Sequence, residues 1–214
     1  MKKYIILALC YALLGVVNAN AREYPKVSHC DVDETYTETC YGEDNKPLNG
    51  WAVEGNQPES AGKQRRKIRK LLRAKKRGNG DTEQLDQELN TAMQTYTLSK
   101  FREGKKSGIS REIDAYGFAV KSTEYSKGKK DGEYVAHYPD HHIQVKAAYK
   151  DGVLDGKVTF FNHRGRKIGY ARYRRGILLK GYCRNNEGER VAMPTDEKTI
   201  ATEVTPCPET SDAD

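Results

Sequence analysis

The stretch that decides the fold is Tyr149–Gly156, which reads YKDGVLDG. A tyrosine stands three positions before a glycine, and a second glycine follows four positions later. Taken alone, this octapeptide fits a phosphate-binding loop, a calcium-binding loop or a turn. A phosphate-binding loop would lead into a helix, and no helical pattern follows. A calcium loop needs more carboxylates than Asp151 and Asp155 provide, so the stretch is predicted to be a turn.

The same pattern recurs at steps of 24 residues along the chain. This constant spacing defines three sets of positions. The aromatic set is Phe101, Tyr125, Tyr149 and Tyr173, the first glycine set is Gly104, Gly128, Gly152 and Gly176, and the second glycine set is Gly108, Gly132 and Gly156. In the last unit Lys180 replaces the second glycine, and Gly181 follows it. Self-similarity at a fixed period is the sequence signature of a repeat architecture. Residues 96–192 are therefore predicted to form a repeat domain.

Each repeat unit is predicted to be a β-hairpin. After Gly132, residues 133–138 (EYVAHY) are rich in strand-forming residues, residues 139–142 (PDHH) supply a turn, and residues 143–149 (IQVKAAY) alternate between apolar and polar. The first glycine of each unit permits a positive φ in a tight turn, and the second opens the next strand without a Cβ. Hairpins in series form one antiparallel β-meander. The fold class is therefore mainly β.

The predicted meander is a thin single layer, because the composition is only 36% hydrophobic and 31% charged. Such a sheet is expected to enclose no pocket. Equivalent positions in the units place Tyr134, Val158 and Tyr182 on one face as cross-strand neighbours, with Cys183 on the other face. The repeat tyrosines are expected to pack across the hairpin joints, with an aromatic and basic strip for a ligand as the alternative.

Three units resemble the bacterial variant of the MORN repeat, as in the YwqK-like antitoxin group. The resembling stretches are YSKGKKDGEY (125–134), YKDGVLDGKV (149–158) and YRRGILLKGY (173–182). The half-unit NKPLNGWAVEG (45–55) resembles the family's opening strand, with Gly50 at the place of a second glycine. The resemblance covers roughly residues 96–192 and implies a twisted sheet of hairpins that serves as a binding or spacing surface. It transfers no active site, because the family shares no catalytic residues.

Residues 1–21 have the features of a secretory signal peptide, with two lysines, an apolar run and the small-residue pattern Ala19-Asn20-Ala21. Its removal takes away Cys10 and leaves four cysteines in an exported, oxidised chain. Four cysteines allow three pairings. The short separations favour Cys30–Cys40 and Cys183–Cys207, which would tie one end of the chain each. The protein is therefore predicted to be periplasmic or secreted, with an N-terminal disulfide segment over residues 22–55.

Residues 56–95 interrupt the repeats and predict an inserted helical hairpin. Residues 63–77 (KQRRKIRKLLRAKKR) hold ten basic and no acidic side chains, with Ile68, Leu71 and Leu72 at helical spacing. After Gly78-Asn79-Gly80, Asp81 is expected to cap a second, more acidic helix. One face of that helix is expected to carry its apolar side chains, which are Leu85, Leu89, Ala92 and Met93.

The basic helix is the candidate site for an anionic partner, with a merely solubilising arm as the alternative. The side chains assigned to this contact are Arg65, Arg66, Lys67, Arg69, Lys70 and Arg73. An acidic protein is the expected partner, and anionic lipid or a cell-envelope polymer is a further candidate. The predicted export of the chain argues against nucleic acid. The narrow apolar stripe favours docking on a membrane surface over insertion. The helix could also dock on the acidic termini of its own chain, which include the tail over residues 193–214.

The sequence contains no pattern that predicts catalysis or a cofactor. No G-x-S-x-G or H-E-x-x-H motif is present, and no paired carboxylates converge on a predicted pocket. His141, His142 and His163 lie in adjacent predicted turns and suggest a surface metal site, but we favour the interpretation that they are polar turn residues, and we expect no metal. The acidic cluster at residues 31–34 is interpreted as a solvated loop and not as a metal site. The sequence therefore predicts a non-enzymatic interaction or scaffold protein, with an antitoxin-like or immunity protein and a membrane-surface binder as alternatives.

Overall fold

The computed structural model describes residues 24–32, 37–58, 60–78, 80–185, 187–193 and 199–207. The predicted signal peptide with Cys10 and most of the predicted acidic tail lie outside the described residues. Within the described part of the chain, no helix is long and apolar enough to cross a membrane.

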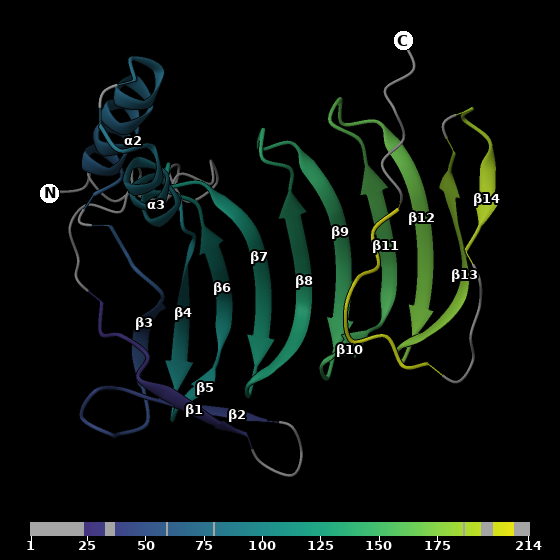
Figure 1. The fold of residues 1–214 in the computed structure, drawn as a ribbon. Helices are drawn as coiled ribbons and strands as arrows, with labels where there is room; N and C mark the ends of the chain where they lie inside the picture. Colours follow the sequence, from purple (N-terminus) through teal and green to yellow (C-terminus); the bar gives the residue numbers. More distant parts are fainter. Residues whose placement is uncertain are drawn as a thin grey trace, which may run out of the picture.

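The protein is mainly β, with a twelve-stranded antiparallel sheet, a small two-stranded sheet and a pair of helices (Figure 1). The small sheet pairs β1 (His29–Val32) with β2 (Glu38–Tyr41), and the helices are α2 (Ala61–Lys76) and α3 (Thr82–Ala92). The strands of the main sheet are β3 (Gly50–Glu54), β4 (Tyr96–Arg102), β5 (Lys105–Lys106), β6 (Gly108–Ile113), β7 (Ala119–Ser126), β8 (Lys129–His137), β9 (Ile143–Lys150), β10 (Val153–Leu154), β11 (Gly156–Phe161), β12 (Lys167–Arg174), β13 (Ile177–Arg184) and β14 (Arg190–Ala192).

The strands of the main sheet follow chain order, as a meander requires. The order runs β14-β13-β12-β11-β9-β8-β7-β6-β4-β3, and the short strands β5 and β10 pair with β4 and β9. The helical hairpin enters between β3 and β4 and stands at one end of the strands, beside β3 and β4 (Figure 1). The mainly β class, the meander and the inserted helical hairpin are thus confirmed.

The glycines that follow the repeat aromatics form tight hairpin turns. Gly104, Gly128, Gly152 and Gly176 have φ values between 75° and 90°. The residue before each of them, Glu103, Lys127, Asp151 or Arg175, also has a positive φ, near 50°. Two successive positive φ values define the type I′ turn, whose twist matches that of the flanking strands. The predicted turn at YKDGVLDG is therefore correct, and the strain falls on the aspartate as well as on the glycine.

Each glycine in the second set lies across the sheet from a repeat aromatic. Gly108 pairs with Tyr125, Gly132 with Tyr149 and Gly156 with Tyr173, and Gly50 stands in the same relation to Phe101. All four glycines have a positive φ. Gly132 lies inside β8 and not at its start, contrary to the prediction, because β8 continues from the turn without a break.

The loops at the opposite end of the strands share a second pattern that the sequence reading treated only as turns. Asp114, Asn162 and Asn185 each accept, through Oδ1, the backbone N–H groups of the residues two and four positions later. Each loop also has a glycine with positive φ three positions on. In the fourth such loop Tyr138 stands at the Asp/Asn position and His141 at the glycine position, and His141 has a φ of 70°. The pattern D/N-x-x-G-x could have located these loops.

One face of the main sheet, here called the covered face, carries Phe101, Tyr149 and Tyr173. Register pairing places all three on the same side, and they are 2%, 4% and 7% exposed. The prediction that the repeat aromatics pack is confirmed for these three, while Tyr125 is only partly buried. Chain segments from both termini supply the second layer that covers this face.

The N-terminal cover lies over β3, β4 and β5. Cys40 and Leu48 pack against Ala52 and Phe101, and Cys40 N–H donates to the carbonyl of Gly104 at 2.7 Å. The Cys30–Cys40 disulfide joins β1 to β2 across this cover, as predicted. The N-terminal segment is thereby held against the hairpin turns of the sheet.

The C-terminal cover, residues 199–207, crosses the sheet over β10 and β11 (Figure 1). Ala201 bonds through its carbonyl to Leu154 N–H and through its N–H to the carbonyl of Gly176. The predicted Cys183–Cys207 disulfide is present and anchors the segment to β13. Ala201, Val204 and Cys207 complete an apolar cluster with side chains of β9, β11 and β12.

The prediction that Tyr182 lies on the same face of the sheet as Val158 is wrong. Val158 pairs with Ala171, which pairs with Gly181, whereas Tyr182 pairs with Tyr170 on the opposite face. The cause is the irregular pairing at Arg172/Tyr173, where Lys180 stands in place of the second glycine and the following residues are shifted by one. A shift of one residue exchanges the two faces of a strand, so Cys183 turns to the covered face and reaches Cys207.

The expectation that the sheet has no hollow is also wrong. Between the two covers, the covered face of β4, β6, β7 and β8 bears polar side chains and forms a hollow of about 250 Å³. The alternation of residues along the strands does not predict this hollow, because its position depends on where the two terminal segments end.

Candidate functional site

Helix α2 is positioned by a cap and by two buried side chains. The Ser60 hydroxyl accepts from Lys63 N–H at 3.2 Å and starts the helix. Ile68 is 1% exposed and Leu71 is buried with it, against α3 and the β6–β7 loop, whereas Leu72 is 46% exposed. Of the three residues of the predicted apolar stripe, Ile68 and Leu71 pack inside the protein, and only Leu72 is exposed.

Helix α3 forms the other half of this packing. The Asp81 carboxylate accepts from Glu83 N–H at 2.9 Å, which confirms the predicted cap. Ala92 is buried, and Leu85 and Leu89 are partly buried against α2. Met93, predicted on the same face, is 47% exposed because it lies past the helix end as the C-cap residue. One ion pair, Lys75–Asp86 at 2.5 Å, links the basic and the acidic helix.

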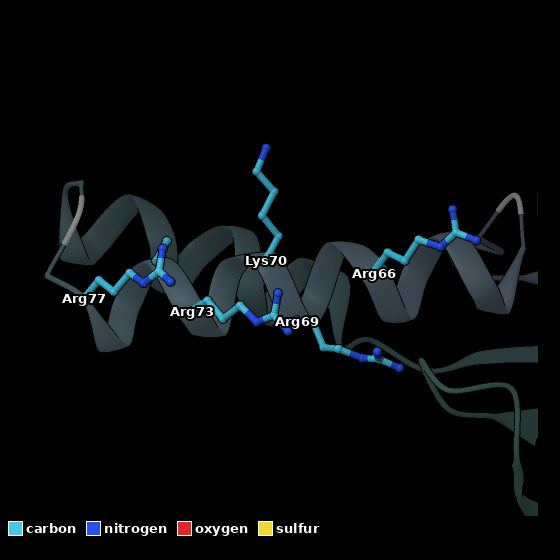
Figure 2. Close-up of a pocket in the computed structure, with 6 residues that line it drawn as sticks. Arg66, Arg69, Lys70, Arg73 and Arg77 are labelled. Carbon is cyan, nitrogen blue, oxygen red and sulfur yellow. The ribbon is translucent and has the colours of Figure 1, made fainter.

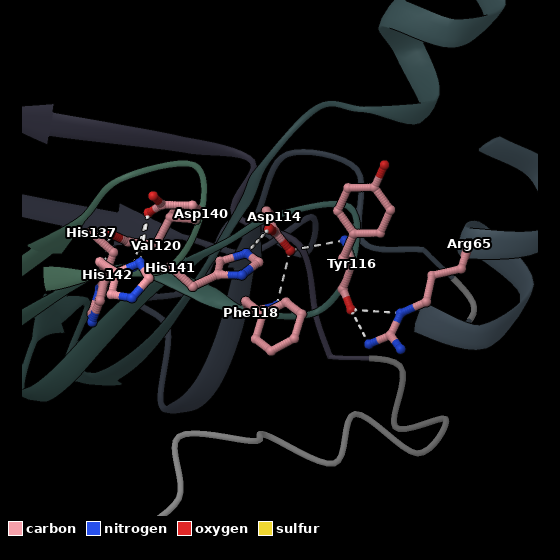
Figure 3. A network of polar contacts seen from close by, with 9 residues as sticks. All are labelled: Arg65, Asp114, Tyr116, Phe118, Val120, His137, Asp140, His141 and His142. Atoms are coloured by element: carbon pink, nitrogen blue, oxygen red, sulfur yellow. Dashed lines mark hydrogen bonds and ion pairs between the residues drawn. The ribbon is translucent and has the colours of Figure 1, made fainter. Parts of the chain in front are cut away.

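Arg65 ties α2 to the main sheet. Its Nε and one terminal nitrogen donate to the carbonyl of Tyr116 at 3.1 and 2.5 Å, and its guanidinium lies 5.8 Å from the centre of the Phe118 ring (Figure 3). Both residues belong to the β6–β7 loop. Arg65, predicted to contact an anionic partner, is thus placed at the base of the helix, where it fixes the direction of α2.

The outer side of α2 presents a row of basic side chains. Residues 66, 69, 70, 73 and 77 recur at helical spacing and line a hollow of about 440 Å³ together with Ala74. Figure 2 shows the side chains of Arg66, Arg69, Lys70, Arg73 and Arg77 along this part of α2. We call these five residues the basic row. None of the five forms an ion pair within the described part of the chain.

The structure thus brings together four of the six predicted contact residues and adds one. Arg66, Arg69, Lys70 and Arg73 belong to the basic row, Lys67 is exposed outside it, and Arg65 is turned to the sheet. Arg77 was missed, although it continues the spacing four residues after Arg73. Its position as the C-cap residue of α2 could have been inferred from Gly78.

The three histidines considered for a metal site are split between two loops. His141 Nε2 lies 3.0 Å from Asp114 Oδ2, and its ring packs against the Phe118 ring with centres 4.0 Å apart and planes tilted by 32° (Figure 3). His142 and His163 instead contact Asp140, at 3.3 and 2.7 Å. Among the described residues, the group of side chains with metal-ligand geometry is Cys30, Glu38 and Cys40, whose two sulfurs are joined in the disulfide.

These histidine contacts link neighbouring loops to each other. The hydrogen bond from His163 lowers the pKa of the Asp140 carboxyl to about 2. Burial lowers the pKa of His137, whose Nδ1 lies 3.4 Å from the carbonyl of Val120. The chain Arg65–Tyr116–Asp114–His141 runs from α2 into the β8–β9 loop, so the helical hairpin rests on a connected set of loops.

The described residues therefore offer two features for function, the basic row on α2 and the polar hollow between the covers. The two disulfides fit a protein that folds outside the cytoplasm. The sequence matches no protein-family model, and a search of curated proteins finds no match to it.

Proposed function

We propose that this protein is a non-enzymatic, extracytoplasmic binding protein that presents the basic row of α2 to an acidic partner protein. The observation that carries the proposal is the alignment of five cations along one hollow with no intramolecular carboxylate partner among the described residues. The resemblance of the repeats to MORN variants, which act as binding or spacing surfaces, supports a scaffold role for the sheet.

Electrostatics favours an anionic partner at this place. Like charges on neighbouring helical turns repel each other, and helical pairs of this kind destabilise an isolated helix. A complementary acidic surface removes this repulsion and accelerates association, with a strength that falls as salt increases. The energy to hold the row in place comes from Ile68, Leu71 and the Arg65 contact, all on the inner side.

An acidic protein suits the basic row better than a bilayer does. Surface helices that bind membranes place a wide apolar face into the interface. Here Ile68 and Leu71 are turned into the protein, and Leu72 is the exposed member of the stripe. The signal-type segment at residues 1–21 supports an encounter with that partner outside the cytoplasm.

A pulldown with the purified protein from the envelope fraction of the producing cells tests the proposal. The variant carries Arg66→Gln, Arg69→Gln and Arg73→Gln. The control carries Lys146→Gln, Lys157→Gln and Arg172→Gln. These substitutions remove the same charge from the face of the main sheet opposite the covered face, here called the open face. The proposal expects an acidic protein that is retained by the native protein and the control, and bound at least about tenfold more weakly by the α2 variant.

Two outcomes contradict the proposal. Equal loss with both variants would show that net charge, and not the basic row, governs retention. Salt-sensitive binding to vesicles of phosphatidylglycerol, with no protein captured, would make the partner a lipid surface. A captured toxin encoded beside this gene, with growth arrest when this gene alone is lost, would identify the protein as an antitoxin.

A further inference from the structure

The polar hollow on the covered face has an unusual lining for the interior of a β-sheet protein. Three ammonium groups face three carboxylates in it: Lys106 with Glu54, Lys121 with Glu112, and Lys130 with Glu203, at 2.9, 2.9 and 2.5 Å. Lys106 keeps only 13% of its side chain exposed. The other five side chains keep 21–74% of their surface exposed, so burial bears mainly on the Lys106 ammonium, and the gathering of three ion pairs in one hollow is what needs a reason.

Hydroxyl groups fill the positions between these pairs. Thr97, Ser110 and Thr123 line the hollow, and Ser110 and Thr123 are buried. Ser110 bonds to Ser99 behind it at 2.7 Å. These strand positions have the same orientation as the buried apolar positions under the two covers, so the change from apolar to polar is confined to the uncovered part of the face.

Aromatic rings border the same hollow. Tyr125 and Tyr134 line it, and Tyr149 packs edge-on against Tyr134, with ring centres 5.8 Å apart. The Tyr149 side chain is buried, yet its hydroxyl has no hydrogen-bond partner among the residues that the structure describes. Buried polar groups are nearly always paired, so this hydroxyl is unusual, although Tyr149 itself does not line the hollow.

We propose that this hollow binds a small, neutral, polyhydroxylated molecule of the monosaccharide class. This site is separate from the basic row and does not depend on the proposed function. Three cations balance three anions in the lining, so a free anion or cation would meet as many repelling as attracting groups.

A neutral polyol uses the hydrogen-bonding capacity that the ion pairs leave over. Each ammonium has three donors and each carboxylate about four acceptor sites, while each pair uses at most one of each, and Glu54 Oε1 lies 2.9 Å from Lys106 Nζ without hydrogen-bond geometry. A sugar hydroxyl donates and accepts at once and can therefore bridge a pair such as Lys121–Glu112 without separating it. The rings of Tyr125 and Tyr134 belong to the lining, and Lys106 Nζ lies 5.7 Å from the centre of the Tyr125 ring, so the contribution of the rings is secondary to that of the polar groups.

The size of the hollow agrees with a single ring. About 250 Å³ is just below the range of about 300–1,000 Å³ that holds drug-sized ligands. Glu203 lies on the C-terminal cover with 74% of its side chain exposed, and its contact with Lys130 closes one side of the hollow. A ligand could enter past this one side chain without unfolding of the sheet.

Binding can be tested with ¹H–¹⁵N spectra of the purified protein. The probes are D-glucose, N-acetylglucosamine and D-galactose, with glycine, L-glutamate and inorganic phosphate as charged comparators, each up to about 10 mM. The proposal expects saturable shifts from at least one sugar at amides of β6, β7 and β8 and at Glu203. Tyr134→Phe and Thr123→Val should each weaken that binding about two- to tenfold.

The matched control is Tyr170→Phe, which removes the same hydroxyl from the open face and should leave affinity unchanged. Absence of saturable shifts from every sugar would overturn the proposal. Saturation by glutamate, glycine or phosphate in place of a sugar would overturn the ligand class. Equal affinity of Tyr134→Phe and the native protein, with both folded by their spectra, would move the site elsewhere.

Discussion

Gly132 in β8 lies directly opposite Tyr149 in β9, with a φ of 123°. A Cβ at Gly132 would come within 2.0 Å of Glu124 Oε2, which accepts from Glu133 N–H at 2.9 Å. The glycine thus serves the backbone conformation and leaves room for a neighbouring carboxylate. The turn glycine Gly152 has a φ of 90° but nothing within 4 Å of its Cβ position.

Gly132→Ala is therefore expected to destabilise the protein more than Gly152→Ala. Both substitutions impose a left-handed conformation on alanine, at about 1–2 kcal/mol. Only the first also displaces Glu124 from its hydrogen bond, which adds about 1 kcal/mol. Urea unfolding followed by circular dichroism measures both free energies of unfolding. Equal losses would show that Glu124 moves aside without cost.

Tyr149→Phe is expected to stabilise the protein or to leave its stability unchanged, because it removes a buried hydroxyl that has no partner within the described part of the chain. An unpaired buried polar group costs about 1–3 kcal/mol. Tyr138→Phe is the matched control, since the Tyr138 hydroxyl donates to the carbonyl of Phe161 at 2.8 Å, and its loss should destabilise by about 1 kcal/mol. Thermal unfolding compares the two variants. A large loss from Tyr149→Phe would reveal a bonded hydroxyl.

Burial also raises the pKa of Tyr149 above its ordinary value of 10.0. The folded state therefore holds the Tyr149 proton more tightly than the unfolded state does. This tyrosine consequently lowers the stability as pH rises above about 10, and has no such effect below that pH. Tyr149→Phe should accordingly lessen the alkaline loss of stability, which the same unfolding measurements can follow.

Ile68→Ala is expected to loosen the helical hairpin, and Leu72→Ala is not. Ile68 is buried between α2, α3 and the β6–β7 loop, where truncation of a large aliphatic side chain costs about 2–5 kcal/mol. Leu72 is exposed on the same helix, and its truncation should stay within about 0.5 kcal/mol. Hydrogen exchange of the α2 amides measures the local effect. Similar protection in both variants would contradict the packing described for Ile68.

His163→Asn is expected to raise the pKa of Asp140 from about 2 toward its model-compound value of 3.8. The depressed pKa means that the contact stabilises the native state fully above pH 3.8, and that this contribution is lost as pH falls through about 2. His142→Asn should have the smaller effect, because the backbone N–H of residue 142 still donates to Asp140. Carboxyl carbon shifts in an NMR titration give both values. A larger shift with His142→Asn would reverse this ranking.

Much of the architecture could be predicted, because glycine and aromatic residues at a fixed step specify local geometry. The tight turns with a positive φ and the strand order follow from such local information, and the two disulfides follow from the short separations of their cysteines. The face of Tyr182 could not be predicted reliably, because one substitution at Lys180 shifts the pairing by a residue. The two-residue period of a strand does not by itself predict such a shift.

The candidate sites were predicted less completely than the fold. The spacing of basic residues located α2, but the sequence could not distinguish Arg65, which binds the Tyr116 carbonyl, from Arg66 in the basic row. That distinction depends on which side of the helix meets the sheet. The polar hollow was missed, because Lys130 and Glu203 lie far apart in the chain and meet only through the C-terminal cover.

The two terminal covers advance over the sheet from opposite edges and stop on either side of the hollow. The C-terminal cover is fastened to β13 by the Cys183–Cys207 disulfide, and the N-terminal cover is held by backbone hydrogen bonds between Cys40, Leu48 and Gly104. One extra 24-residue unit in the middle would add two strands and part the covers by about 10 Å, since neighbouring strands lie about 4.8 Å apart. The number of strands between the two covers would thereby set the width of the hollow.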